Sequence, residues 1–102
     1  MFEVQILIPQ WDNNGKAFPQ ARFDRFEEKA VDWLGGYSRQ MGISGAWKND
    51  EGRFFHDSSR VYIVGCKGLA DAHEAFVLAA YARGLFEQEA IYIRYLGLSE
   101  TV

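Results

Sequence analysis

Several residue types are scarce in this 102-residue chain, and each scarcity excludes a class of protein. A single cysteine, Cys66, cannot form an internal disulfide, and with only two histidines the chain has few ligands for a transition metal. The net charge of -3 gives no positive field for a phosphate backbone. No apolar run nears the length of a membrane span, and no basic leader opens the sequence. We expect a cytoplasmic protein without metal or cofactor that binds neither nucleic acid nor membranes.

The chain does contain enough apolar material for a folded core. Hydrophobic residues make up 48% of the sequence and aromatic residues 16%, which is more than a disordered segment carries. A chain of this length matches the common size of one domain and buries enough surface to fold without disulfides. We therefore expect residues 1–102 to form a single domain.

Three segments have the composition and alternation of β-strands, at residues 2–8, 60–66 and 89–96. Pro9 ends the first of them, because proline has no backbone donor for the ladder. A long hairpin is expected over residues 37–66, since a cluster of turn formers separates its two arms. Polar residues at 57–59 interrupt the returning arm, which predicts a bend there and a projecting hairpin tip, and Gly42 and Gly45 in the opposite arm would permit the same bend.

Two segments have apolar residues at helical spacing. The first opens at Pro19 and ends at Gly35-Gly36, and its charged residues at 24–29 fall largely off the apolar stripe, as a solvated helix face does. The second runs from about residue 69 to 83, and Gly84 is its expected stop. Its apolar stripe contains Leu69, Ala72, Phe76, Ala79 and Ala80 and is broadened by Ala75, Leu78 and Ala82. These helices separate the strands into two strand-helix-strand halves.

The order strand, helix, two strands, helix, strand predicts the α+β, ferredoxin-like βαββαβ fold. Right-handed crossovers close the two halves into a four-stranded antiparallel sheet with both helices on one face. The first and third strands are the most aliphatic and are expected at the centre. On this prediction Val61 and Ile63 point toward the helices.

Several local strings resemble a family of small uncharacterised bacterial ferredoxin-like proteins. These strings are Phe18-Pro19, Gly35-Gly36, Gly45-Ala46-Trp47, Asp50-Glu51-Gly52 and the run from Phe86 to Tyr92. They lie mainly in turns and at strand starts and span most of the chain. The resemblance implies the same fold, and it implies no activity, because the family has no assigned function.

The sheet face away from the helices is the predicted functional surface. Strand alternation assigns to it a polar and aromatic set, with Trp47 at its rim: Glu3, Gln5, Trp47, Tyr62, Tyr92 and Arg94. With Leu7, Val64 and Leu96 they would form a patch that soluble monomers rarely leave exposed, which predicts a homodimer. An RNA platform is disfavoured, since no basic-glycine-aromatic signature surrounds Tyr62.

No catalytic constellation is recognisable in the sequence. His56 and Asp57 are neighbours in a strand and point to opposite faces, so they cannot act together. We expect a non-catalytic binding or assembly module that self-associates through its open sheet face. Two alternatives stay open: a dimeric small-molecule-binding protein or small enzyme with a cavity on that face, and a protein partner at the hairpin tip. The ordinary role of Arg94 would be a surface ion pair with Glu3.

Overall fold

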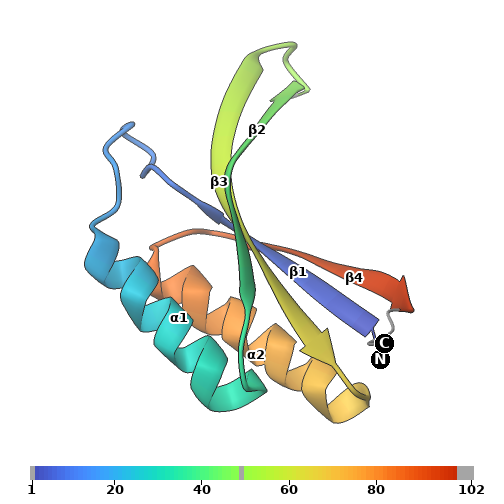
Figure 1. Cartoon of the computed structure of the whole chain (residues 1–102). Coiled ribbons are helices and arrows are strands. Elements are labelled where there is room, and N and C mark those ends of the chain that lie inside the picture. The colour runs from blue at the N-terminus through green and yellow to red at the C-terminus, as the bar shows by residue number, and fades with distance from the viewer. Residues whose placement is uncertain (1, 49, 99–102) are drawn as a thin grey trace.

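The computed structural model describes residues 2–48 and 50–98, and at 43, 47, 54–57, 97 and 98 it describes the backbone only. The elements, in chain order, are β1 (Phe2–Pro9), α1 (Gln20–Leu34), β2 (Ser38–Lys48), β3 (Phe54–Cys66), α2 (Leu69–Leu85) and β4 (Tyr92–Leu98). The strands form an antiparallel sheet in the order β2-β3-β1-β4, with both helices on one side (Figure 1). The predicted ferredoxin-like α+β fold, with the first and third strands at its centre, is confirmed.

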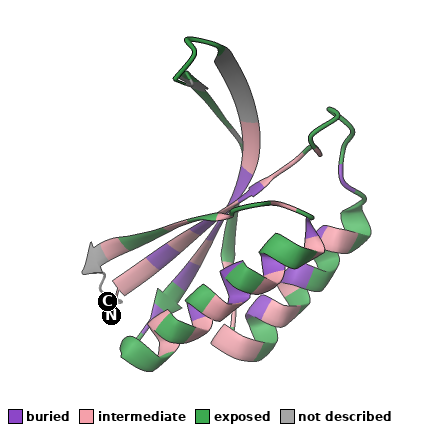
Figure 2. Cartoon of the chain, turned by 180° about the vertical axis from the view of Figure 1, so that it is seen from behind, coloured by how far each residue is buried: buried purple, intermediate pink, exposed green. Residues whose placement is uncertain are grey.

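The hydrophobic core lies between the sheet and the helices, where the buried positions of both gather (Figure 2). Strand β1 alternates cleanly, and Val4, Ile6 and Ile8 are fully buried. An aromatic cluster closes one end of the core, because Phe86 lies 5.2 Å from Phe18 and 4.9 Å from Phe23 between ring centroids. Such contacts add to the free energy of burial and join the start of α1 to the end of α2.

Strand β3 turns the opposite set of side chains toward the helices from the predicted one. Tyr62 is paired with Ile6, and residues directly opposite in an antiparallel ladder lie on the same face. Tyr62 and Val64 are therefore buried in the core, whereas Val61 and Ile63 face away from the helices. The prediction was wrong because residues 61–64 are all apolar, so the sequence does not show which alternate set of side chains faces the helices. The pairing of β3 with β1 determines it.

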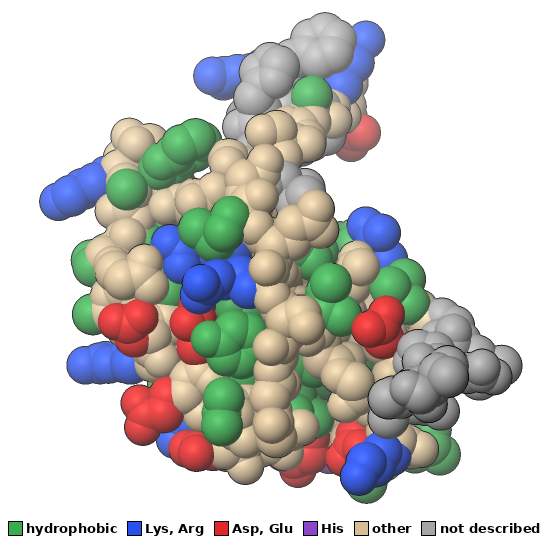
Figure 3. Space-filling view, in the orientation of Figure 1, with side chains coloured by type: hydrophobic (Ala, Val, Ile, Leu, Met, Phe, Trp, Pro, Cys, Tyr) green, Lys and Arg blue, Asp and Glu red, His purple; other side chains and the backbone are tan. Residues whose placement is uncertain are grey.

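Strands β2 and β3 continue beyond the rest of the sheet as a hairpin that stands clear of the body of the molecule (Figures 1 and 3). One extra residue interrupts their pairing between Gln40 and Ile43, where Gly42 has a φ of 71°. Glycine adopts this left-handed conformation without the steric cost that a side chain brings. The projection matches the prediction, and so does the irregularity at Gly42 of β2. The bend expected in the returning strand is not found, because β3 runs through residues 57–59 without interruption.

Helix α2 differs from the prediction in its end and in its buried face. It passes through Gly84 and ends at Leu85, and Glu87 takes the positive φ of 53° instead. Leu69 is 88% exposed and Phe76 is 55% exposed, against the prediction, whereas four other members of the predicted stripe are buried as expected: Ala75, Leu78, Ala79 and Ala82. This helix is apolar on most sides, so only packing against α1 and the sheet selects its inner face. No helix in the described part of the chain is long and apolar enough to cross a membrane.

Candidate functional site

The face of the sheet away from the helices brings together four of the predicted side chains. Gln5 is paired with Arg94, and Leu7 is paired with Tyr92, so both pairs project from the same side of β1 and β4. Glu3 shares that side of β1 but lies opposite Gly65 of β3. We call this surface the open face, and its predicted members are Glu3, Gln5, Tyr92 and Arg94.

The open face has an apolar centre. Val61 is 5% exposed although no helix covers it, and Leu7 and Ile63 are half-buried. At the edge of this centre Tyr92 is 57% exposed. These side chains lie next to one another across three neighbouring strands. Val61 is already buried within the chain, so the apolar surface that a partner could cover comes from Tyr92 and from the accessible parts of Leu7 and Ile63.

Two predicted members do not contribute a described side chain to the open face. Tyr62 is fully buried on the opposite side of the sheet, where its ring lies 4.7 Å from that of Phe26. Its assignment to the open face was wrong for the reason of register given above. The side chain of Trp47 lies outside the described residues.

Arg94 does not form the predicted surface ion pair with Glu3. No carboxylate in the described ranges lies within ion-pair distance of its guanidinium, because the register puts Gln5 opposite Arg94. Instead the guanidinium carbon lies 5.5 Å from the centroid of the Tyr92 ring. This distance is that of a cation–π contact, and the guanidinium donates no hydrogen bond to another described residue, so its N–H groups are available to a ligand.

A hollow of about 540 Å³ lies at the end of the open face, where β1 ends and β4 begins. We call it the open-face hollow, and it is lined by Leu7, Pro9, Asn13, Ser59, Gln88, Ala90, Tyr92 and Arg94. Its volume falls in the range of small-molecule sites. Among the described residues Arg94 is the only charged one in the lining, and Gln88 fixes the approach to β4 by donating from its side-chain amide to the carbonyl of Phe86 at 3.0 Å.

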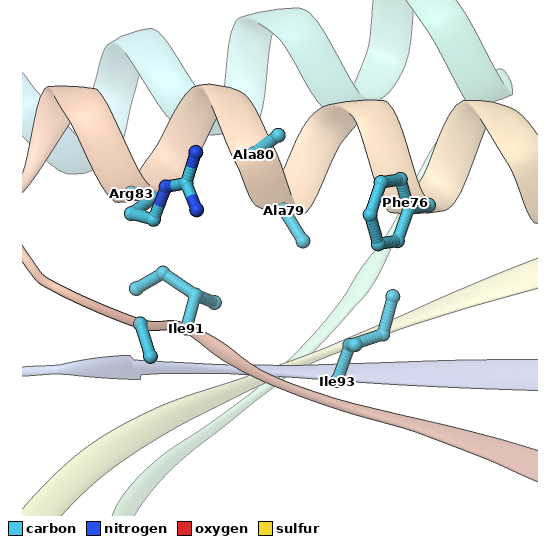
Figure 4. A pocket seen from close by; sticks show the side chains of 7 residues that line it. Phe76, Ala79, Ala80, Arg83, Ile91 and Ile93 are labelled. Atoms are coloured by element: carbon cyan, nitrogen blue, oxygen red, sulfur yellow. The ribbon is translucent and has the colours of Figure 1, made fainter.

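A second, smaller hollow of about 200 Å³ separates α2 from the edge strand β4. Figure 4 shows Phe76, Ala79 and Arg83 of α2 above Ile91 and Ile93. Most of these side chains are apolar and Phe76 is half-exposed, so this groove carries no arrangement of polar groups that would orient a ligand.

The most strongly hydrogen-bonded carboxylate belongs to a residue that the sequence assigned to a solvated helix face. Glu27 of α1 accepts from the hydroxyls of Tyr37 at 2.8 Å and Tyr62 at 2.7 Å, and from Arg39 at 2.6 Å. Burial raises the pKa of the Glu27 carboxyl, but these donors together lower it by more, so the pKa lies below its usual value. The cluster joins α1 to β2 and β3.

Burial is the main cause that raises the pKa of the Tyr62 hydroxyl, and the carboxylate of Glu27 adds to it. Tyr62 therefore stays protonated and acts as a donor within the core, not as an acid or base. One sequence signal points to Glu27, which follows Phe23 by four residues and so lies on the buried side of the helix.

The described residues contain no group of three or more His, Cys, Asp or Glu side chains that could hold a metal ion. His73 is exposed on α2, and the side chain of His56 lies outside the described residues. Cys66 is a free, buried thiol, and burial raises its pKa.

No family model and no curated protein matches the chain. Among solved structures it is similar to the divalent cation tolerance protein CutA1 of Thermus thermophilus, with a TM-score of 0.67 and 14% identity over 99% of this chain and 86% of that one. The chain shares that protein's fold. CutA1 of Oryza sativa has a TM-score of 0.66 at 12% identity, covering 99% of this chain and 82% of the other.

A phage SAM lyase in complex with S-methyl-5′-thioadenosine is similar to the same degree, with a TM-score of 0.67 at 14% identity over 92% of this chain and 78% of that chain. These likenesses agree with the resemblance to small ferredoxin-like proteins at the level of the fold. At these identities they show the fold alone, and the neighbours themselves carry different activities in their names.

Proposed function

We propose that this protein is a small binding or assembly module that associates with a second copy of itself through the open face. The observation that supports it most is the accessible apolar surface of that face, to which the exposed Tyr92 and the half-buried Leu7 and Ile63 contribute around the buried Val61. Contiguous apolar surface of this kind is buried in most soluble proteins, and polar groups at its edge give the contact its register. Gln5 and Arg94 supply such groups.

The same proposal places the protein in a reducing compartment such as the cytoplasm. A single buried thiol with a raised pKa, Cys66, is what a protein made without disulfides carries. Non-catalytic action is supported by the titratable groups themselves, because Tyr62, whose pKa is strongly raised, donates its hydroxyl to Glu27 inside the fold.

Tyr92→Glu tests the association. Sedimentation of the wild-type chain is expected to give a dimer. The variant is expected to raise the dimer dissociation constant at least about 100-fold, because the aromatic ring is lost from the contact and a carboxylate must be desolvated in its place. Tyr95→Glu is the matched control, since Tyr95 is 51% exposed on the same strand and projects from the other side of it. A monomeric wild type, or equal effects of the two variants, contradicts the proposal.

The open-face hollow favours a second candidate, a protein that binds a small molecule on this face. Its volume of about 540 Å³ suits such a ligand, and its lining combines an apolar wall with a few polar groups. The phage neighbour was solved with a nucleoside-sized molecule, which supports the capacity of this fold to hold one. The titrations described next test this candidate, and no saturable binding of any probe would remove it.

A further inference from the structure

The open-face hollow has the charge pattern of an anion site, although the chain as a whole is acidic. The net charge of the protein is -3, yet the part of the lining that the structure describes contains one arginine and no acidic residue. Arg94 has no carboxylate partner among the described residues and keeps the edges of its guanidinium free. A cation whose charge is not neutralised inside the protein favours a ligand that brings the opposite charge.

The geometry at Arg94 selects among anions. One guanidinium, beside the Tyr92 ring, can donate two parallel N–H bonds from one of its edges to the two oxygens of a carboxylate, and this matches one negative charge with one positive charge. A phosphate dianion carries two negative charges and would need a second cation to neutralise it, and the described lining contains none. A carboxylate is therefore the better match.

The rest of the lining indicates what the carboxylate is attached to. Leu7, Pro9 and Ala90 form an apolar wall, and the exposed ring of Tyr92 continues it. Polar groups without charge, from Ser59 and Asn13, complete this part of the lining. Flat apolar bodies pack on such a wall, while the neutral groups orient polar atoms at their edge.

From these observations we infer that the open-face hollow binds a small organic carboxylate with a planar apolar body, and that Arg94 is the residue that pairs with the carboxylate. The inference rests on the second candidate function above and adds to it the chemical class of the ligand. It does not require self-association, because all the lining residues belong to one chain.

The inference is tested by NMR titration of the amide and side-chain N–H signals of the intact protein. The probes are benzoate, its neutral analogue benzamide, and phenylphosphonate. For a fragment of this size we expect benzoate to saturate with a dissociation constant on the order of 1 mM and benzamide to bind at least about tenfold more weakly. The largest shifts are expected at Tyr92, Arg94 and Ser59.

Arg94→Gln is expected to weaken benzoate binding at least about tenfold and to leave benzamide binding unchanged. Arg83→Gln is the matched control, because Arg83 is exposed and lines the smaller hollow beside α2. Equal binding of benzoate and benzamide, tighter binding of phenylphosphonate, or unchanged benzoate binding by Arg94→Gln overturns the carboxylate assignment and leaves small-molecule binding standing. Saturation by none of the three probes overturns both. The sedimentation experiment reports on self-association separately.

Discussion

Replacing Glu27 by glutamine measures how much the carboxylate cluster stabilises the fold. Hydrogen bonds to a charged group contribute about 1.5–3 kcal/mol when buried, and Tyr62, which donates one of the three, is fully buried. The ion pair with Arg39 is partly exposed, so its contribution is closer to about 0.5 kcal/mol. Glutamine keeps one acceptor oxygen and replaces the other with a donor. We therefore expect Glu27→Gln to lower the free energy of unfolding by about 2 kcal/mol.

Urea denaturation followed by tryptophan fluorescence and circular dichroism gives this free energy, and both probes should report one transition. Glu28→Gln is the matched control, because Glu28 is the next residue on α1 and is exposed. It removes the same charge from the same helix and is expected to change stability by less than about 0.5 kcal/mol. Equal effects of the two variants would refute the assignment of stability to the cluster.

The cluster also predicts how stability depends on pH. The pKa of Glu27 is lower in the folded protein than the ordinary value of 4.5. The unfolded chain therefore binds this proton more readily, and the stabilisation is fully present above pH 4.5 and lost as the pH falls below it through the folded pKa. Glu27→Gln is expected to lose that part of the acid dependence, whereas Glu28→Gln retains it. A parallel decline in wild type and Glu27→Gln would contradict the shift.

Two further predictions concern buried groups that take no part in the open face. Arg60 is 9% exposed, its guanidinium carbon lies 3.6 Å from the centroid of the Phe23 ring, and its buried Nε has no hydrogen-bond partner in the described structure. Arg60→Met should therefore leave the thermal midpoint unchanged or raise it. A decrease of more than about 2 kcal/mol in the free energy of unfolding would show that the hydrogen bond from Arg60 to Gln20 outweighs the cost of burying the charge. The thiol of Cys66 is buried and its pKa is raised. A disulfide reagent at about pH 8 should therefore modify the native protein at least about 100-fold more slowly than the urea-unfolded chain. Equal rates of modification would contradict this burial.

The parts of the fold that were predictable have a strong local signal. Strand β1 alternates between apolar and polar residues, so the sequence shows which of its faces is buried. Gly35 ends α1 with a φ of 82°, as is typical of a glycine that follows a helix. For the open face this local signal was sufficient on β1 and β4. Glu3, Gln5, Tyr92 and Arg94 were all assigned to the correct side of the sheet.

The errors occur where the local signal is absent. Residues 61–64 of β3 are apolar throughout, and most of α2 is apolar on every side, so neither segment has a polar face from which its orientation can be read. At Glu27 a local signal was present but misleading. Its charge and its place beside the apolar stripe predicted a solvated side chain, whereas three donors on or next to β2 and β3 surround it. Those donors lie 10 to 35 residues away, beyond the reach of a helical pattern.

The sequence by itself determined the order of the elements, the ferredoxin-like fold and the exposed side of β1, because strand and helix periodicities and turn formers act over a few residues. Only the tertiary structure decided that Tyr62 belongs to the core, that Arg94 stacks on Tyr92 without Glu3 as a partner, and that a hollow forms beside them. Each of these depends on the register between strands. Register is a long-range property, since a shift of one residue moves every side chain of a strand to the other face.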